Sequence, residues 1–225
     1  MNTILDTLHI RKYFRRTHDP IWQLQLGVVF VIALQYFTDS SFLPYDKFLV
    51  IALEAVLMIA LAIVTTDGYH DVSRPRRTLA VVLVGIIAAI NIFSLIFLVR
   101  ALLIGGTRLP GVELLANGFT IYTTNIFMFA MLYWEMDGGG PERRVRNEKQ
   151  RDFLFPQMIH HYFGDEHWLP GFVDYLYLST TNVTNFASAD TVPLTHRSKL
   201  LMMIQAFVSV VAVVLVAAHA ISILR

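Results

Sequence analysis

The chain has 225 residues, of which 55% are apolar and 16% charged, and its formal net charge is +1. A mean hydropathy of +0.54 with so little charge excludes an ordinary soluble domain and predicts an integral membrane protein. The absence of cysteine excludes disulfides, thiol catalysis and zinc–thiolate sites. We expect no enzymatic activity, cofactor or metal, because the sequence contains no nucleotide-binding loop or catalytic triad.

The apolar residues fall in blocks that predict membrane helices. Residues 1–20 include the basic stretch RKYFRR at 11–16, and we expect an N-terminal interfacial segment there rather than a nucleic-acid site. Five later blocks approach the ~20 residues that cross a hydrocarbon core. They cover residues 21–38, 48–66, 79–104, 112–136 and 198–224. The first three form a three-helix membrane region over 21–110, and residues 111–225 form a second region.

The second region also contains an apolar segment that is too short to span. A linker over 138–170 opens with three glycines and a charged run, and residues 172–183 then predict a short helix before a polar loop at 184–190. Such a segment is tolerated at membrane depth only inside protein or beside a water-filled cavity. The predicted fold class is therefore an all-α integral membrane protein with five transmembrane helices, a re-entrant helix and a filter-like loop.

Residues 177–195, with the sequence YLSTTNVTNFASADTVPLT, align without a gap to the potassium-channel pattern Y-F-S-x-T-T-x-T-T-V-G-Y-G-D-x-x-P-x-T. The segment thus resembles the pore of the tetrameric pore-loop cation channel superfamily. The matching positions, including a lysine where the family often has arginine, are Tyr177, Ser179, Thr181, Thr184, Asp190, Pro193, Thr195 and Lys199. The resemblance implies a homotetramer with an outer helix at 112–136, a pore helix at 172–183 and an inner helix at 198–224.

The filter itself departs from that family, which has V-G-Y-G where this chain has Phe-Ala-Ser-Ala. Alanine in the left-handed conformation costs roughly 1–2 kcal/mol per residue, so we expect the backbone to leave the potassium-selective geometry. A ring of Asp190 carboxylates would concentrate cations at a wider opening. The alternative roles are capping of a turn for Asp190 and hydrogen bonding at the end of the pore helix for Thr184 and Asn185. The predicted filter residues are Thr184, Asn185, Phe186, Ala187, Ser188, Ala189 and Asp190.

The inner helix carries a stripe of small and polar residues at helical spacing, which predicts its pore-lining face. This stripe consists of Gln205, Ser209, Ala212, Val216 and His219. We interpret His219 either as a packing residue or as a group that makes gating sensitive to pH.

Ionisable residues within or near the predicted spans are costly and usually face protein or water. Besides Glu135, near the end of its span, they are Glu54, Arg100 and Glu113. Glu54 lies in the middle of its span. We expect it to pair with Arg100, with a role in a proton or cation path as the alternative.

Lysine and arginine placement predicts a cytoplasmic N-terminus. Five spans then put the re-entrant loop on the cytoplasmic face, inverted relative to potassium channels; an external basic linker is the alternative. We expect a homotetrameric channel in a prokaryotic inner (plasma) membrane, weakly selective or non-selective among monovalent cations. A non-conducting channel-like scaffold or sensor, or a small secondary transporter using Glu54 and Arg100, are the other hypotheses.

Overall fold

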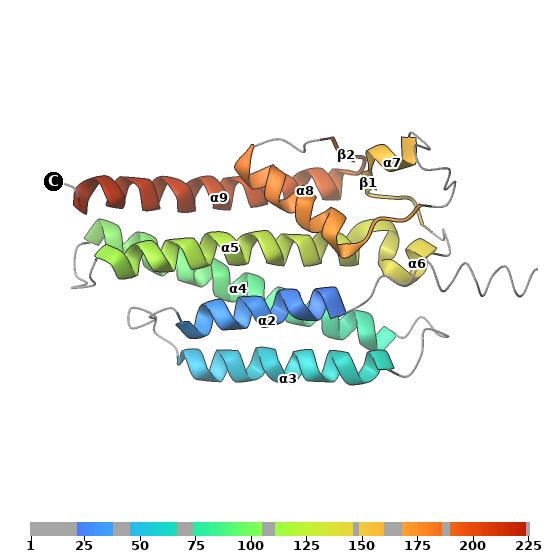
Figure 1. The fold of residues 1–225 in the computed structure, drawn as a ribbon, viewed down its shortest axis with the longest axis horizontal. Coiled ribbons are helices and arrows are strands. Elements are labelled where there is room, and N and C mark those ends of the chain that lie inside the picture. Colours follow the sequence, from blue (N-terminus) through green and yellow to red (C-terminus); the bar gives the residue numbers. More distant parts are fainter. Residues whose placement is uncertain are drawn as a thin grey trace, which may run out of the picture.

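The computed structural model describes residues 22–37, 46–66, 74–104, 111–145, 149–159, 168–185 and 190–223. Its long helices lie side by side in an elongated bundle (Figure 1). These helices are α2 (Trp22–Phe37), α3 (Lys47–Thr66), α4 (Arg74–Ile104), α5 (Gly111–Met136) and α9 (His196–Ile223), with the shorter α8 (Phe172–Thr184) beside α9. The short elements at one end of the bundle are η1 (Asp137–Gly139), α6 (Pro141–Val145), β1 (Phe153–Leu154), α7 (Pro156–Ile159) and β2 (Val192–Pro193).

The long helices lie where the sequence predicts the five apolar blocks. Three of them contain segments that are long and apolar enough to cross a membrane, namely Arg76–Arg100, Val112–Gly139 and His196–Ala218. The described residues are therefore mostly helical and consistent with a membrane protein. The N-terminal segment 1–20 that the sequence predicts as interfacial lies outside the described residues.

The exposed faces of the helices are as apolar as the buried ones. On α4, Leu83 and Ile87 are buried in the main core, whereas Ile92 and Phe93 point outward. On α3, Leu61 is buried while Ile59 and Ile63 are exposed. A helix that is hydrophobic all round is typical of a membrane span or a deeply buried helix. This pattern is the physical reason why the sequence predicts spans so readily.

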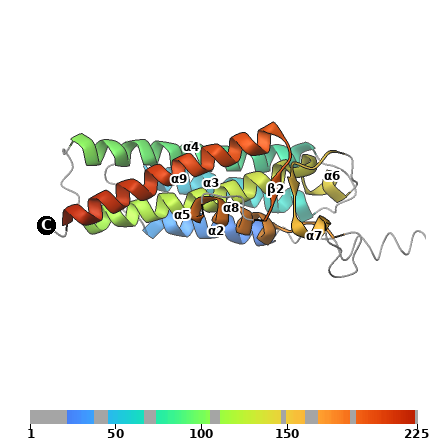
Figure 2. The ribbon, with the colours of Figure 1, turned by 90° about the horizontal axis from the view of Figure 1, so that it is seen from above.

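Helix α5 occupies the centre and contacts α2, α4, α8 and α9. Seen from above, α9 runs obliquely over α5, with α4 on one side and α8 on the other (Figure 2). Buried aromatic rings surround the C-terminal end of α5. Tyr133 packs edge-on against Phe153, and Trp134 packs edge-on against Phe172. Such edge-to-face pairs add to the energy of burial and hold the start of α8 against α5.

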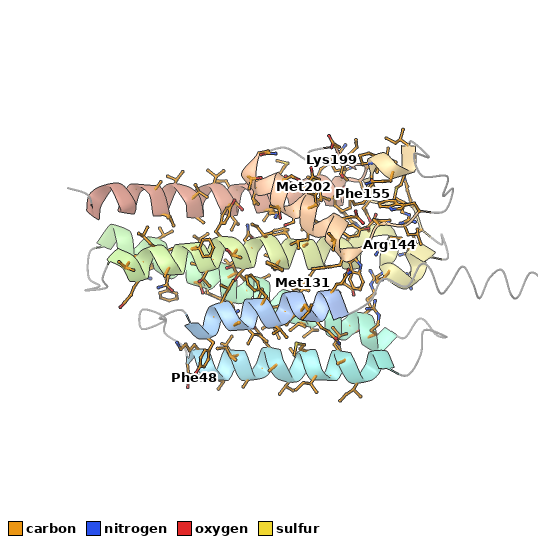
Figure 3. The ribbon with its side chains drawn as sticks, viewed as in Figure 1. Phe48, Met131, Arg144, Phe155, Lys199 and Met202 are labelled. Carbon is orange, nitrogen blue, oxygen red and sulfur yellow. The ribbon has the colours of Figure 1, made fainter. Side chains whose placement is uncertain are left out.

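The chain leaves α5 and enters α9 at the same end of the bundle. Strands β1 and β2 pair antiparallel, with Phe153 opposite Pro193 and Leu154 opposite Val192. Next to them the Thr195 hydroxyl donates to Asp152 Oδ1 at 2.6 Å, and Leu194 N donates to Asp152 O at 2.8 Å. Arg144, Phe155, Lys199 and Met202 all lie toward this end, while Phe48 lies at the opposite end (Figure 3). Helix α8 is thus inserted between two segments that are fixed to each other.

The closest approach of α5 and α9 depends on Gly118. A Cβ atom at this position would collide with Cγ2 of Val216. Valine has one strongly preferred rotamer in a helix, so α9 rather than the side chain would have to move. We expect Gly118→Ala to lower the free energy of unfolding by about 1–3 kcal/mol. Thermal unfolding in detergent measures this effect.

Two further variants separate this clash from a general effect of the substitution. Gly118→Ala combined with Val216→Ala removes the obstructing atom and should recover most of the loss. Gly85→Ala is the matched control, because a Cβ atom there meets nothing within 4 Å. Its higher helix propensity should leave stability unchanged or raise it by about 0.5–1 kcal/mol. Equal destabilisation at Gly85 and Gly118 would contradict the close approach.

Candidate functional site: the contact of α5, α8 and α9

The polar residues that the sequence assigns to a pore gather around α8. This helix begins after Gly171, whose N–H donates to the Asp174 carboxylate at 2.7 Å and so satisfies one of the free donors of the first turn. Ser179 is fully buried, and its hydroxyl donates to the carbonyl of Ile126 in α5 at 2.7 Å. Asn182 donates to the carbonyl of Met202 in α9 at 3.1 Å. Hydrogen bonds therefore join α8 to both long helices.

Gln205 is the centre of this contact. Its side-chain oxygen accepts from the Tyr133 hydroxyl at 2.6 Å and from Asn182 Nδ2 at 2.9 Å. Its side-chain nitrogen donates to the Ser179 hydroxyl at 2.6 Å and also to the Ser179 carbonyl at 3.2 Å. One turn after Gln205 in α9, the Ser209 hydroxyl accepts from Asn125 Nδ2 of α5 at 2.7 Å. A buried polar network is stabilising where its members are satisfied, as the Gln205 amide is, although Asn125 Oδ1 is buried without a partner; the bonds of Gln205 set the position of α8.

This network corrects the predicted pore-lining stripe. Gln205, Ser209 and Ala212 are all buried within a single chain, against α5 and α8. A pore-lining side chain must remain uncovered within each copy of the chain, and these three side chains are covered. Val216 lies against Gly118 in the same contact. His219 lies in α9, but its side chain is outside the described residues. The sequence pattern correctly marked one face of α9, but that face packs inside the chain.

Beyond the polar first turn of α9, its exposed residues include a different stripe, which is wholly apolar. Met203, Phe207, Val210 and Val214 are exposed and follow one another at spacings of four, three and four residues. We call this the outer stripe of α9. On α8, Val173 and Tyr177 are exposed as well. Lipid or another protein surface is the kind of environment that such residues fit.

The predicted filter is described only at its two ends. Phe186, Ala187, Ser188 and Ala189 lie outside the described residues. Thr184, Asn185 and Asp190 flank them, and all three are exposed. The Thr184 hydroxyl donates to the carbonyl of Thr180 at 2.9 Å, so its proton is used within the helix and its oxygen lone pairs remain free. This bond agrees with the alternative role of hydrogen bonding at the helix end.

A cluster of charges lies at the end of the bundle where β1 and β2 meet. Asp137 is fully buried, and its Oδ1 accepts from the backbone N–H of Asp152 at 2.6 Å and of Phe153 at 3.2 Å. Its Oδ2 accepts from the Tyr175 hydroxyl at 2.6 Å. Arg144 lies over the Tyr175 ring at 5.0 Å. This carboxylate therefore joins the end of α5, the β1 segment and α8.

Two arginines offset the charge of Asp137. Arg144 Nη1 donates to the carbonyl of Trp134 at 2.8 Å and lies 3.9 Å from Asp137 Oδ2. Arg151 Nη1 lies 3.7 Å from the same oxygen. Burial lowers the pKa of the Arg151 guanidinium, while the Asp137 carboxylate acts in the opposite direction. A second buried pair lies nearby, in which Arg76 Nη1 is 3.1 Å from Glu135 Oε1.

The predicted pair of Glu54 with Arg100 is wrong in this structure. Glu54 is fully buried in α3, and its Oε1 accepts from Gln35 Nε2 of α2 at 3.3 Å. Arg100 is exposed near the end of α4. Glu113 is half-buried in the first turn of α5, where its carbonyl accepts from Asn117 Nδ2 at 2.8 Å. The three intramembrane ionisable residues therefore do not gather into one site.

Sequence reasoning missed the Asp137 cluster, although a signal for it exists. Gly138, Gly139 and Gly140 follow Asp137, and all three have positive φ angles of 60°, 84° and 103°. Glycine adopts such angles at little cost, which allows the chain to turn sharply behind a buried carboxylate. A triple glycine directly after an acidic residue at a helix end is the pattern that could have indicated the cluster.

The described residues contain no group of three or more histidine, aspartate or glutamate side chains arranged to hold a metal. Comparisons with protein-family models, with curated proteins and with solved structures find no match to this chain.

Proposed function

We propose that the chain forms a homotetrameric pore that passes monovalent cations with little selectivity. The observation that carries this proposal is the geometry of α8. It packs against both α5 and α9 and ends part of the way along them, and by β2 the chain lies again at the end where α8 began. A half-length helix with a polar loop is the arrangement that pore-loop channels use to place a constriction.

The depth of the loop supports a pore more strongly than its sequence does. Asn182 near the end of α8 meets Gln205, which is nine residues after His196. At 1.5 Å per residue this contact lies about 14 Å along α9. In a hydrocarbon core about 30 Å thick, the exposed Asn185 would be close to the middle. Polar, non-helical backbone at that depth must be covered by protein or water, and copies of the chain around a central axis would supply both.

A non-conducting channel-like scaffold is the second candidate, and one observation favours it. The polar face of α9 is used inside the chain, so the outer stripe of α9 would leave an apolar lining for the inner part of any pore. Hydrophobic constrictions close a pore by excluding water. In this case the tetramer would assemble and fail to conduct.

Current through the wild type separates the candidates, and Asp190→Asn then tests the predicted carboxylate ring. A ring of carboxylates raises the local cation concentration, so its loss should lower single-channel conductance several-fold at ~0.01 M ionic strength, where the Debye length is about 30 Å. The loss should almost disappear at ~1 M, where the Debye length is about 3 Å. Planar-bilayer recordings at both salt concentrations measure this difference.

Asp46→Asn is the matched control, because Asp46 precedes α3 at the opposite end of the bundle and is also exposed. Its side chain accepts from the backbone N–H of Phe48 at 2.9 Å, and asparagine caps a helix equally well. Its conductance should match that of the wild type at both salt concentrations. Identical conductance in the two variants would contradict a role for Asp190 at the mouth of the pore.

A further inference from the structure

The buried carboxylate of Glu54 is in an unusual environment. Its side chain is fully buried in the middle of α3, and only Oε1 has a partner, the neutral amide of Gln35 at 3.3 Å. Oε2 is buried without any hydrogen-bond partner. An isolated carboxylate costs several kcal/mol on transfer into a low-dielectric interior. One long hydrogen bond from a neutral amide does not offset that cost.

No cation compensates the charge within the part of the chain that the structure describes. Helix α3 packs against α2 and α4. Apart from Glu54, the ionisable side chains that the structure describes on these three helices are Tyr36, Lys47, Arg76, Arg77 and Arg100, and none of these five forms an ion pair with Glu54; the side chain of Arg74 in α4 lies outside the described residues. Arg76 pairs instead with Glu135, and Arg100 is exposed. Among the described side chains, the one group that bonds to the Glu54 carboxylate is the neutral amide of Gln35.

The groups near Glu54 also fit a proton better than a metal ion. Gln35 presents its N–H to Glu54, and a metal ion would need oxygen atoms there instead.

We propose that Glu54 is a proton-binding site, whose carboxyl group carries a proton at neutral pH when α2, α3 and α4 are packed together. The proton makes the group neutral and turns Oε2 into a donor. Ionisation would place a bare charge in the core, so the packing of α2 against α3 should loosen as the pH rises. The site links proton binding to the N-terminal helices and does not depend on the proposed pore.

Infrared absorption of protonated carboxyl groups tests the proposal directly in the purified full chain. At pH 7 the wild type should show a protonated carboxyl band that Glu54→Gln lacks. Glu113→Gln is the matched control, because this half-buried residue lies in another helix, and it should retain the band. A protonated carboxyl band that is unchanged in Glu54→Gln at pH 7 would show that Glu54 is ionised and would overturn the proposal.

A second variant keeps the test decisive if Glu54→Gln does not fold. Gln35→Leu preserves the Glu54 carboxyl and removes its one hydrogen-bond donor, which favours the charged form. The pH at which the band is half lost should therefore rise by about one unit relative to the wild type. An unchanged midpoint, or a wild-type chain without any protonated carboxyl band at pH 7, would refute the assignment.

Discussion

Replacing Asp137 by alanine is expected to be among the most damaging single changes in this chain. The substitution leaves the N–H groups of Asp152 and Phe153 and the Tyr175 hydroxyl without their acceptor. It also removes the counter-charge of Arg144 and Arg151. Removing one partner of a buried ion pair costs about 3–5 kcal/mol. Thermal and denaturant unfolding in detergent should show a loss of this size.

A graded series distinguishes this mechanism from simple loss of packing. Asp137→Asn keeps an oxygen that accepts from the two backbone N–H groups, so its stability should lie between those of the wild type and Asp137→Ala. Tyr175→Phe removes only the hydroxyl that donates to Asp137, and should cost about 1–3 kcal/mol. If asparagine and alanine at residue 137 destabilise equally, the backbone hydrogen bonds to this carboxylate do not carry the effect.

Gln205→Leu is the second substitution with a large expected effect. It introduces an apolar side chain of similar size and removes every bond that joins Tyr133, Ser179 and Asn182 through this amide. Each buried group left unpaired costs about 1–3 kcal/mol in water-soluble proteins, and somewhat less between membrane helices. We expect a total loss of about 2 kcal/mol, together with faster hydrogen exchange of the α8 backbone amides.

A double-mutant cycle checks that the loss arises from the network. Tyr133→Phe removes one hydroxyl without changing the shape of the core, so it tests a single bond to Gln205. The double variant should be more stable than the sum of the single effects predicts, with a coupling of about 0.5 kcal/mol or more. Additive losses would mean that Tyr133 and Gln205 do not interact as the structure places them.

The sequence predicts the positions of the helices well, but it predicts poorly what each helix face packs against. The apolar blocks locate α2, α3, α4, α5 and α9, because length and hydropathy alone decide where a membrane helix forms. The short α8 was also predicted, from its length and the polar loop that follows it. What the polar face of α9 packs against was not predicted, because a stripe containing Gln205 and Ser209 fits an internal contact as well as a pore. Periodicity identifies a polar face but does not say what covers it.

Ion pairs show the same limit of prediction from sequence. Glu54 and Arg100 are both intramembrane ionisable residues in sequence, but the partner of Glu54 is the uncharged Gln35. Arg76 and Glu135 form a close pair across 59 residues, and nothing in the sequence connects them. Ion pairing depends on which helices are neighbours and how they are rotated. Neither property follows from the composition of the individual spans.

The most direct test of the pore is the reversal potential of purified protein in planar bilayers, with sodium on one side and potassium on the other. A weakly selective cation pore predicts a current that reverses near zero. A current that reverses close to the potassium equilibrium potential would contradict the expected loss of potassium geometry at Ala187 and Ala189. No current from a folded preparation, over a range of voltage and pH, would contradict the pore and favour the non-conducting scaffold.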